Sequence, residues 1–188
     1  MVIILKVISG KYKGRNLKGY NIEGTRPTQE RVKESLFSMI QGYITNSTCL
    51  DLFAGSGNLG IESLSNGSKF CYFVDNNKIA INTINCNLKM LDDNYLEFSK
   101  VLKSDYKDCL NYFKKNQITF DIIFLDPPYK TNYLTDILCF IDNNSLLNEN
   151  GIVVVEYEFD TIFSNYKNMT EIKSRKYGYK KIKIYKKK

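Results

Sequence analysis

Short apolar runs alternate with stretches of helical spacing through the middle of the chain. The apolar runs predict buried strands at 48–53, 70–74, 98–102, 120–125 and 152–157. Apolar residues spaced three and four apart predict helices at 57–66, 78–91, 106–115 and 133–141. Strands that alternate with helices are typical of an α/β fold, in which helices cover both faces of a mostly parallel sheet.

The two ends of the chain depart from this rhythm. Two short β-like runs at 2–8 and 15–18 predict an N-terminal hairpin. Runs at 171–175 and 180–185, with little helix between them, predict an antiparallel pair of strands. This pair brings the expected number of strands in the sheet to seven.

A loop at residues 25–28 leads from the hairpin into a further helix. Thr28 is placed to cap this helix, whose apolar face runs from Val32 to about Gly42. We therefore expect a basic hairpin extension over residues 1–24 and one larger domain over residues 25–188.

The net charge of +7 is concentrated at the two ends of the chain. Residues 1–31 hold seven Lys and Arg against two acids, and residues 167–188 hold ten against one. The middle of the chain, 32–166, holds ten basic and seventeen acidic residues. Basic ends on an acidic body favour a polyanionic partner such as RNA or DNA. The alternative is that these lysines are ordinary solvated surface.

The absence of histidine excludes several classes of site. Neither a Ser-His-Asp nor a Cys-His centre is possible, and a zinc site with histidine ligands is excluded as well. The five cysteines stand singly, so we expect buried thiols and no metal site. No apolar stretch approaches the roughly 20 residues of a membrane span, and we expect a cytoplasmic protein.

A glycine-rich motif begins at Asp51 and continues as Leu-Phe-Ala-Gly-Ser-Gly-Asn-Leu-Gly. The turn at Gly55–Gly57 lets a ligand approach the backbone, and the helix after it presents unpaired N–H groups. The glycine spacing alone does not distinguish NAD from S-adenosylmethionine. Asp51 would repel a pyrophosphate but suits the cationic amino group of a methionine moiety, so S-adenosylmethionine is favoured. A glycine-rich turn without a ligand is the alternative.

Acidic residues also follow the next two predicted strands. Asp75 ends the second strand, where a carboxylate can accept both hydroxyls of a ribose. Asp105 follows the third strand and is placed either to accept from an adenine amino group or to cap the helix after it. Ligands of an open α/β sheet bind outside the carboxyl ends of the strands. A shared ligand therefore explains acids at several of these ends.

The sequence Asp126-Pro127-Pro128-Tyr129 is the sharpest signal in the chain. The Asp126 carboxylate and the Pro127 carbonyl can each accept one N–H of a nucleobase amino group. This would aim the nitrogen lone pair at a methyl donor and stabilise the positive charge that develops on nitrogen. The prolines stiffen the loop, and Tyr129 can stack on the base. The alternative is a proline-rich turn without a catalytic role.

Together these motifs resemble the class I S-adenosylmethionine-dependent methyltransferases. The chain is most similar to the bacterial ribosomal RNA small subunit methyltransferase D family. The resemblance covers nearly the whole chain and includes Gly10, Gly14-Arg15, Arg26-Pro27-Thr28, residues 31–37, both motifs described above, and Tyr177-Gly178 with Tyr185. It implies a Rossmann-like fold and the methylation of N2 of one guanine in 16S ribosomal RNA.

The resemblance also implies roles for individual residues. The expected cofactor site comprises Arg26, Pro27, Thr28, Asp51, Phe53, Gly55, Gly57, Asp75, Asn76, Asp105 and Tyr106. The expected catalytic residues are Asp126, Pro127, Pro128 and Tyr129, and the expected substrate contacts are Lys11, Lys13, Arg15, Arg31 and Tyr129. Asp75 departs from the family, which usually has Glu there. The expected partner is 16S ribosomal RNA within the small subunit or an assembly intermediate, bound by a monomer.

Three other functions compete with this interpretation. An adenine-N6 DNA methyltransferase would use the same clamp, although the chain has no room for a separate target-recognition domain. An RNA-binding module with a vestigial cofactor fold would not need intact motifs. An NAD-dependent oxidoreductase would need a proton donor that the sequence does not offer.

Overall fold

Seven strands form the central sheet. A computed structural model describes residues 4–19, 30–128, 133–158, 163, 165–178 and 180–188. The strands of the sheet are β3 (Thr48–Asp51), β4 (Phe70–Asp75), β5 (Ser99–Lys103), β6 (Phe120–Leu125), β7 (Leu147–Glu158), β8 (Met169–Tyr177) and β9 (Lys180–Lys187). They lie in the order β5-β4-β3-β6-β7-β9-β8.

The sheet is mostly parallel, as predicted. Strands β3 to β7 pair in parallel, and β9 runs antiparallel between β7 and β8. This confirms the predicted antiparallel pair at the end of the sheet. On one side of β3 lie β4 and β5, and on the other lie β6 and β7. The strand order therefore reverses between β3 and β6, which is where ligands of open α/β sheets bind.

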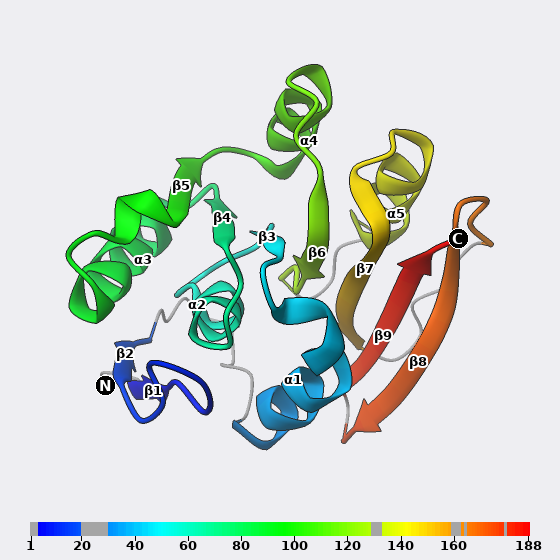
Figure 1. Ribbon diagram of the computed structural model, residues 1–188. Helices are drawn as coiled ribbons and strands as arrows, with labels where there is room; N and C mark the ends of the chain where they lie inside the picture. The colour runs from blue at the N-terminus through cyan, green and yellow to red at the C-terminus, as the bar shows by residue number, and fades with distance from the viewer. Residues whose placement is uncertain (1–3, 20–29, 129–132, 159–162, 164, 179) are drawn as a thin grey trace.

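Helices cover both faces of this sheet (Figure 1). The helices are α1 (Glu30–Ile44), α2 (Asn58–Ser65), α3 (Lys78–Leu91), α4 (Tyr106–Lys115) and α5 (Tyr133–Asn143), with a short 3-10 helix at Tyr95–Glu97. The first three pack on one face, and α4 and α5 pack on the other. Within the described residues, no helix is long and apolar enough to cross a membrane.

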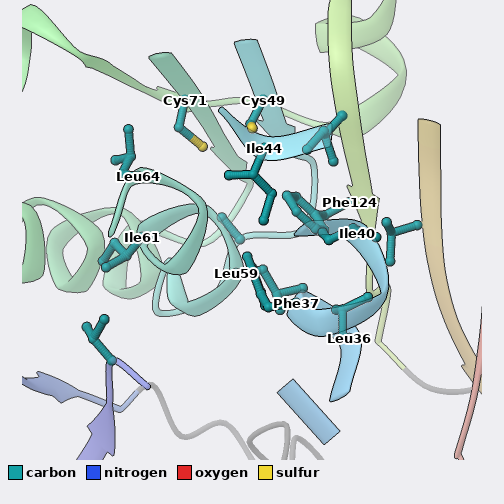
Figure 2. Packing of buried hydrophobic residues seen from close by; sticks show 14 of the residues in the cluster. Leu36, Phe37, Ile40, Ile44, Cys49, Leu59, Ile61, Leu64, Cys71 and Phe124 are labelled. Carbon is teal, nitrogen blue, oxygen red and sulfur yellow. The ribbon is translucent and has the colours of Figure 1, made fainter. Parts of the chain in front are cut away.

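Strand β6 shows why the central strands read as continuous apolar runs. Successive side chains of a strand point to opposite faces, and both faces of this sheet are covered. Ile122 and Phe124 enter the core under α1 to α3, whereas Ile123 and Leu125 enter the core under α4 and α5. Figure 2 shows Phe37 of α1 beside Phe124, and their ring centroids lie 6.0 Å apart.

Strand β7 begins earlier than its apolar run indicates. The sequence predicts a strand at 152–157, but β7 begins at Leu147, which pairs with Phe120. The register then shifts before Ile122 pairs with Ile152. The intervening residues 148–151 read as a polar turn, and Asn150 adopts a positive φ of 62°. This irregularity in the ladder hides the first part of the strand from a pattern-based prediction.

The N-terminal hairpin is present and packs closely on the larger domain. It consists of β1 (Ile4–Lys6) and β2 (Asn16–Lys18), which pair antiparallel. Its apolar residues Leu5, Val7, Tyr12 and Leu17 join the same core as α1, α2 and α3. The predicted domain boundary at residue 24, the loop at 25–28 and the Thr28 cap lie outside the described residues.

The turn of the hairpin lies against the end of α2. At Gly10, a Cβ atom would lie 1.8 Å from the carbonyl oxygen of Ser65, and φ is +76°, so only glycine fits. The N–H of Lys11 donates to that same carbonyl at 2.7 Å. The N–H of Tyr12 donates to the Ser65 hydroxyl at 2.9 Å. Backbone contacts therefore fix the hairpin relative to the helix that follows the glycine motif.

Candidate active site

Acidic residues gather at the carboxyl edge of four neighbouring strands. Asp51 and Asp75 are the last residues of β3 and β4, and Asp126 directly follows β6. Asp105 lies two residues after β5. Because these four strands are adjacent and parallel, the acids share one edge of the sheet. Asp51 and Asp126 flank the point where the strand order reverses, as a ligand site there requires.

The glycine motif forms a tight turn from β3 into α2. Gly57 caps α2 with a left-handed φ of 80°, which glycine adopts without strain. A Cβ atom on Gly60 would lie 2.3 Å from the Phe73 ring, so Gly60 allows α2 to pack closely on β4. The N–H of Gly60 donates to Asp51 Oδ2 at 3.0 Å. The turn, the helix and the first acid thus form one unit.

Asp51 is almost fully buried, with 2% of its surface exposed. Burial raises the pKa of Asp51 to about 7, the Gly60 N–H opposes that rise, and the nearby Asp75 adds to it. A buried carboxyl group of this kind gains from a positively charged partner. The ammonium group of an amino-acid ligand would supply such a partner, and its contact with Asp51 stays a prediction.

Asp75 holds the glycine turn in place. Its Oδ2 accepts the N–H of Gly55 at 2.9 Å, and its Oδ1 accepts the N–H of Asn77 at 2.8 Å. Each carboxylate oxygen has two acceptor sites, so both can still accept a ribose hydroxyl. Asn76 lies next to Asp75 with an exposed side chain. Contact of these two residues with a ribose stays a prediction.

Asp105 caps α4, which confirms the interpretation of this residue as a helix cap. Its Oδ1 accepts the N–H of Lys107 at 2.9 Å. The next residue, Tyr106, is buried and packs against Phe53 and Tyr133, with ring centroids 5.7 and 4.9 Å apart. Among the described residues, no hydrogen-bond partner satisfies the buried Tyr106 hydroxyl. Contact of Asp105 or Tyr106 with an adenosine moiety stays a prediction.

Asp126 is half-buried directly after β6, and in the strand order it lies between Asp51 of β3 and Glu156 of β7. Burial raises the pKa of Asp126 well above its usual range, and Glu156 raises it further. Lys180 acts in the opposite direction, and Asp51 adds a smaller increase. The side chain of Pro127 is buried and that of Pro128 is exposed. Tyr129, Arg26, Pro27 and Thr28 lie outside the described residues.

The expected substrate contacts lie apart from the acids. Lys11, Lys13 and Arg15 are exposed on the hairpin turn, and Arg15 Nη1 donates to the Met90 carbonyl at the end of α3. The turn also contacts the end of α2, and an eight-residue helix is roughly 12 Å long. These three cations therefore lie toward the opposite end of the helices from the glycine motif. Arg31 is exposed in the first turn of α1.

Two charged residues beside Asp126 were missed by the sequence analysis. Glu156 of β7 and Lys180 of β9 are buried and form an ion pair. Glu156 directly follows the apolar run 152–155, just as the other acids follow the apolar runs of their strands. Its position in the sequence could therefore have identified it as a residue of the site. Lys180 carries no such signal, because only the antiparallel pairing of β7 with β9 brings it to Glu156.

Comparisons with known proteins agree with this geometry. The family described as "Conserved hypothetical protein 95" matches residues 5–186. The YlbH protein of Bacillus subtilis is 41% identical over 97% of this chain and 99% of its own length. The ribosomal RNA small subunit methyltransferase D of Haemophilus influenzae is 36% identical over 96% of this chain and 93% of its own length.

The fold is likewise found among solved structures. A crystal structure from Haemophilus influenzae has a TM-score of 0.79 at 32% identity and covers 98% of this chain and 99% of its own. The matched segment spans the hairpin, the glycine motif, the Asp-Pro-Pro-Tyr motif and the C-terminal strand pair. The chain therefore belongs to the family of the ribosomal RNA small subunit methyltransferase D.

Proposed function

We propose that this protein transfers a methyl group from S-adenosylmethionine to the exocyclic N2 amino group of a guanine in 16S ribosomal RNA. One observation carries the proposal: Asp51 with its glycine turn and Asp126 with its prolines flank the same strand reversal. The residues proposed to cradle the cofactor and those proposed to clamp the amino group therefore share one edge of the sheet. Membership of an rRNA methyltransferase family supports the choice of substrate.

The residues on the β3 and β4 side would hold the cofactor. Asp51 would bind its ammonium group, the Gly55–Gly57 turn would let it lie against the backbone, and Asp75 would accept from the ribose. The Tyr106 hydroxyl offers an unused hydrogen-bonding group near the adenosine end. When bound, S-adenosylmethionine supplies an activated methyl group on a sulfonium centre.

The residues that follow β6 would hold the target base. The Asp126 carboxylate and the Pro127 carbonyl would each accept one N–H of the guanine amino group. This draws the nitrogen lone pair out of conjugation and directs it to the methyl group. Both acceptors would stabilise the positive charge on nitrogen as the new N–C bond forms and the bond from the methyl group to the sulfonium breaks, which leaves S-adenosylhomocysteine. The extra proton then leaves the nitrogen, and no strong base is needed because a methylated ammonium of this type is strongly acidic.

The basic hairpin extends the surface that RNA would cover. Lys11, Lys13 and Arg15 are exposed and lie toward the opposite end of the helices from the glycine motif. They would therefore contact phosphates remote from the target base. Such contacts strengthen binding and set the orientation of the RNA without reading its sequence. A structured substrate, such as the small ribosomal subunit or an assembly intermediate, would reach both regions at once.

Asp126→Asn tests this assignment, because it keeps the shape of the side chain and removes its charge. We expect the rate of methyl transfer to fall by at least about a hundredfold. Binding of S-adenosylhomocysteine, measured by calorimetry, should stay within a factor of about three. The matched control is Asp108→Asn, an exposed position in α4, which should leave both quantities unchanged. Equal loss of binding and transfer in Asp126→Asn would mean that the residue is structural.

A further inference from the structure

A row of charged side chains crosses one face of the sheet at its carboxyl edge. Asp51 pairs with Phe124, and Leu125 pairs with Val155, so Asp126 and Glu156 follow side by side. Phe124 and Val154 point to the face covered by α1. Because side chains alternate along a strand, Asp51, Asp126 and Glu156 belong to that same face.

Lys180 completes the row from the antiparallel strand β9. Ile182 pairs with Glu156, and Ile182 points to the face covered by α1. Lys180 lies two residues from Ile182, so its side chain reaches the same face, where it forms the ion pair with Glu156. Only 7% of the Lys180 side chain and 4% of the Glu156 side chain are exposed. This pair is therefore shielded from the salt that weakens surface pairs.

The balance of charge around Asp126 makes this lysine important. Among the described residues that influence Asp126, Asp51 on β3 and Glu156 on β7 are acidic, and Lys180 on β9 is basic. The part of α1 that covers β6 is apolar and presents Phe37 to Phe124. Two neighbouring carboxylates that lose their cation cannot both stay ionised at low cost.

We propose that Lys180 and Glu156 are positioning residues for methyl transfer, with Lys180 supplying the positive charge that favours the ionised form of the Asp126 carboxylate. This inference rests on the proposed function, in which Asp126 binds the amino group of the target base. An ionised carboxylate accepts N–H groups through both oxygens, whereas a protonated one presents an O–H donor. Glu156 is needed because an unpaired lysine would bind Asp126 directly and withdraw it from the base.

Two variants separate the contributions of the acid and of the lysine. Glu156→Gln removes a negative charge beside Asp126 and should lower the pKa of Asp126 by about one pH unit. Adding Lys180→Met to Glu156→Gln removes the positive charge without leaving a buried carboxylate unpaired. The double variant should raise the pKa again by about one pH unit relative to Glu156→Gln. A purely structural pair would leave the acid limb of the rate profile unshifted in both variants.

The pKa of Asp126 is measured by carbon-13 NMR of the aspartate carboxyl groups, with Asp126→Asn identifying the signal. The single-turnover rate of methyl transfer is followed over the same pH range, and thermal unfolding verifies that each variant is folded. Parallel movement of the NMR pKa and of the acid limb of the rate profile would support the proposal. An NMR pKa that stays constant in both variants would overturn the proposal. The role of Asp126 itself is tested separately, by the Asp126→Asn variant. An NMR pKa that moves without the rate profile would also overturn the proposal, and would show that Asp126 does not govern transfer.

Discussion

The Nζ atom of Lys33 lies 2.9 Å from Oε2 of Glu62, and both side chains are fully buried. Glu62 also accepts from the backbone N–H groups of Ile8 and Ser9, at 3.0 and 2.9 Å. Lys33 donates to the carbonyl of Lys6 at 2.6 Å and to the side chain of Asn58 at 2.7 Å. This single ion pair therefore joins the hairpin, α1 and the beginning of α2.

We expect Glu62→Gln to destabilise the fold by about 3–5 kcal/mol, because it leaves the buried ammonium of Lys33 without its counter-charge. Chemical denaturation gives this free energy of unfolding directly. The control is Glu171→Gln, which breaks the more exposed pair with Lys183 and should cost less than about 1 kcal/mol. Similar losses in the two variants would contradict the central role of the buried pair.

The exposed cations of the hairpin should contribute to RNA affinity but not to cofactor affinity. Replacing Lys11, Lys13 and Arg15 by Gln keeps the apolar contacts of the hairpin with the core. We expect weaker binding to 16S RNA. The slope of log affinity against log salt concentration should become shallower by the equivalent of about two to three phosphate contacts. Replacing the exposed Lys107, Lys114 and Lys115 of α4 is the matched control. If both triple variants lose RNA affinity equally, the hairpin is not the specific contact.

Cofactor binding should depend on pH through Asp51. Its pKa is about 7 in the free protein, and a bound ammonium group would lower it. Ligand then binds the ionised form better, so affinity should rise as pH increases from 6 to 8 and level off above that range. Calorimetry with S-adenosylhomocysteine in buffers of different ionisation enthalpy should detect release of a proton near pH 7. Affinity that falls with rising pH would contradict the pairing of Asp51 with the ammonium group.

We expect Gly60→Ala and Gly42→Ala to change the stability of the fold in opposite directions. In Gly60→Ala the added methyl group would meet the Phe73 ring, and we expect a loss of about 1–3 kcal/mol. In Gly42→Ala the methyl group meets nothing within 4 Å inside α1, so better helix propensity should add up to about 1 kcal/mol. Thermal unfolding distinguishes the two. A stable Gly60→Ala protein would mean that α2 and β4 can separate at no cost.

Local patterns were sufficient for most of the fold and for part of the site. The central strands are buried on both faces, so each reads as an apolar run, and acids at the ends of those runs marked the site edge. The beginning of β7 was missed because residues 148–151 read as a turn. Asp105 was ambiguous because a helix cap and a ligand contact require the same residue at the same place.

Contacts between distant parts of the chain had no local signal. Lys180 joins Glu156 only through the register of β7 and β9. Lys33 and Glu62 meet because α1 and α2 pack on the same face of the sheet. Lys180 counted toward the basic C-terminal end of the chain, although the structure buries it. Charge counts along a sequence therefore overestimate the number of cations that RNA can reach.

The most direct test of the proposed activity offers the protein three substrates in parallel with tritiated S-adenosylmethionine. These are small ribosomal subunits that lack the modification, naked 16S RNA and duplex DNA, and the labelled nucleoside is identified after digestion. We predict label in N2-methylguanosine from ribosomal RNA, with the ratio of subunit to naked RNA indicating the preferred form. Label found only in N6-methyladenine of DNA would contradict this account.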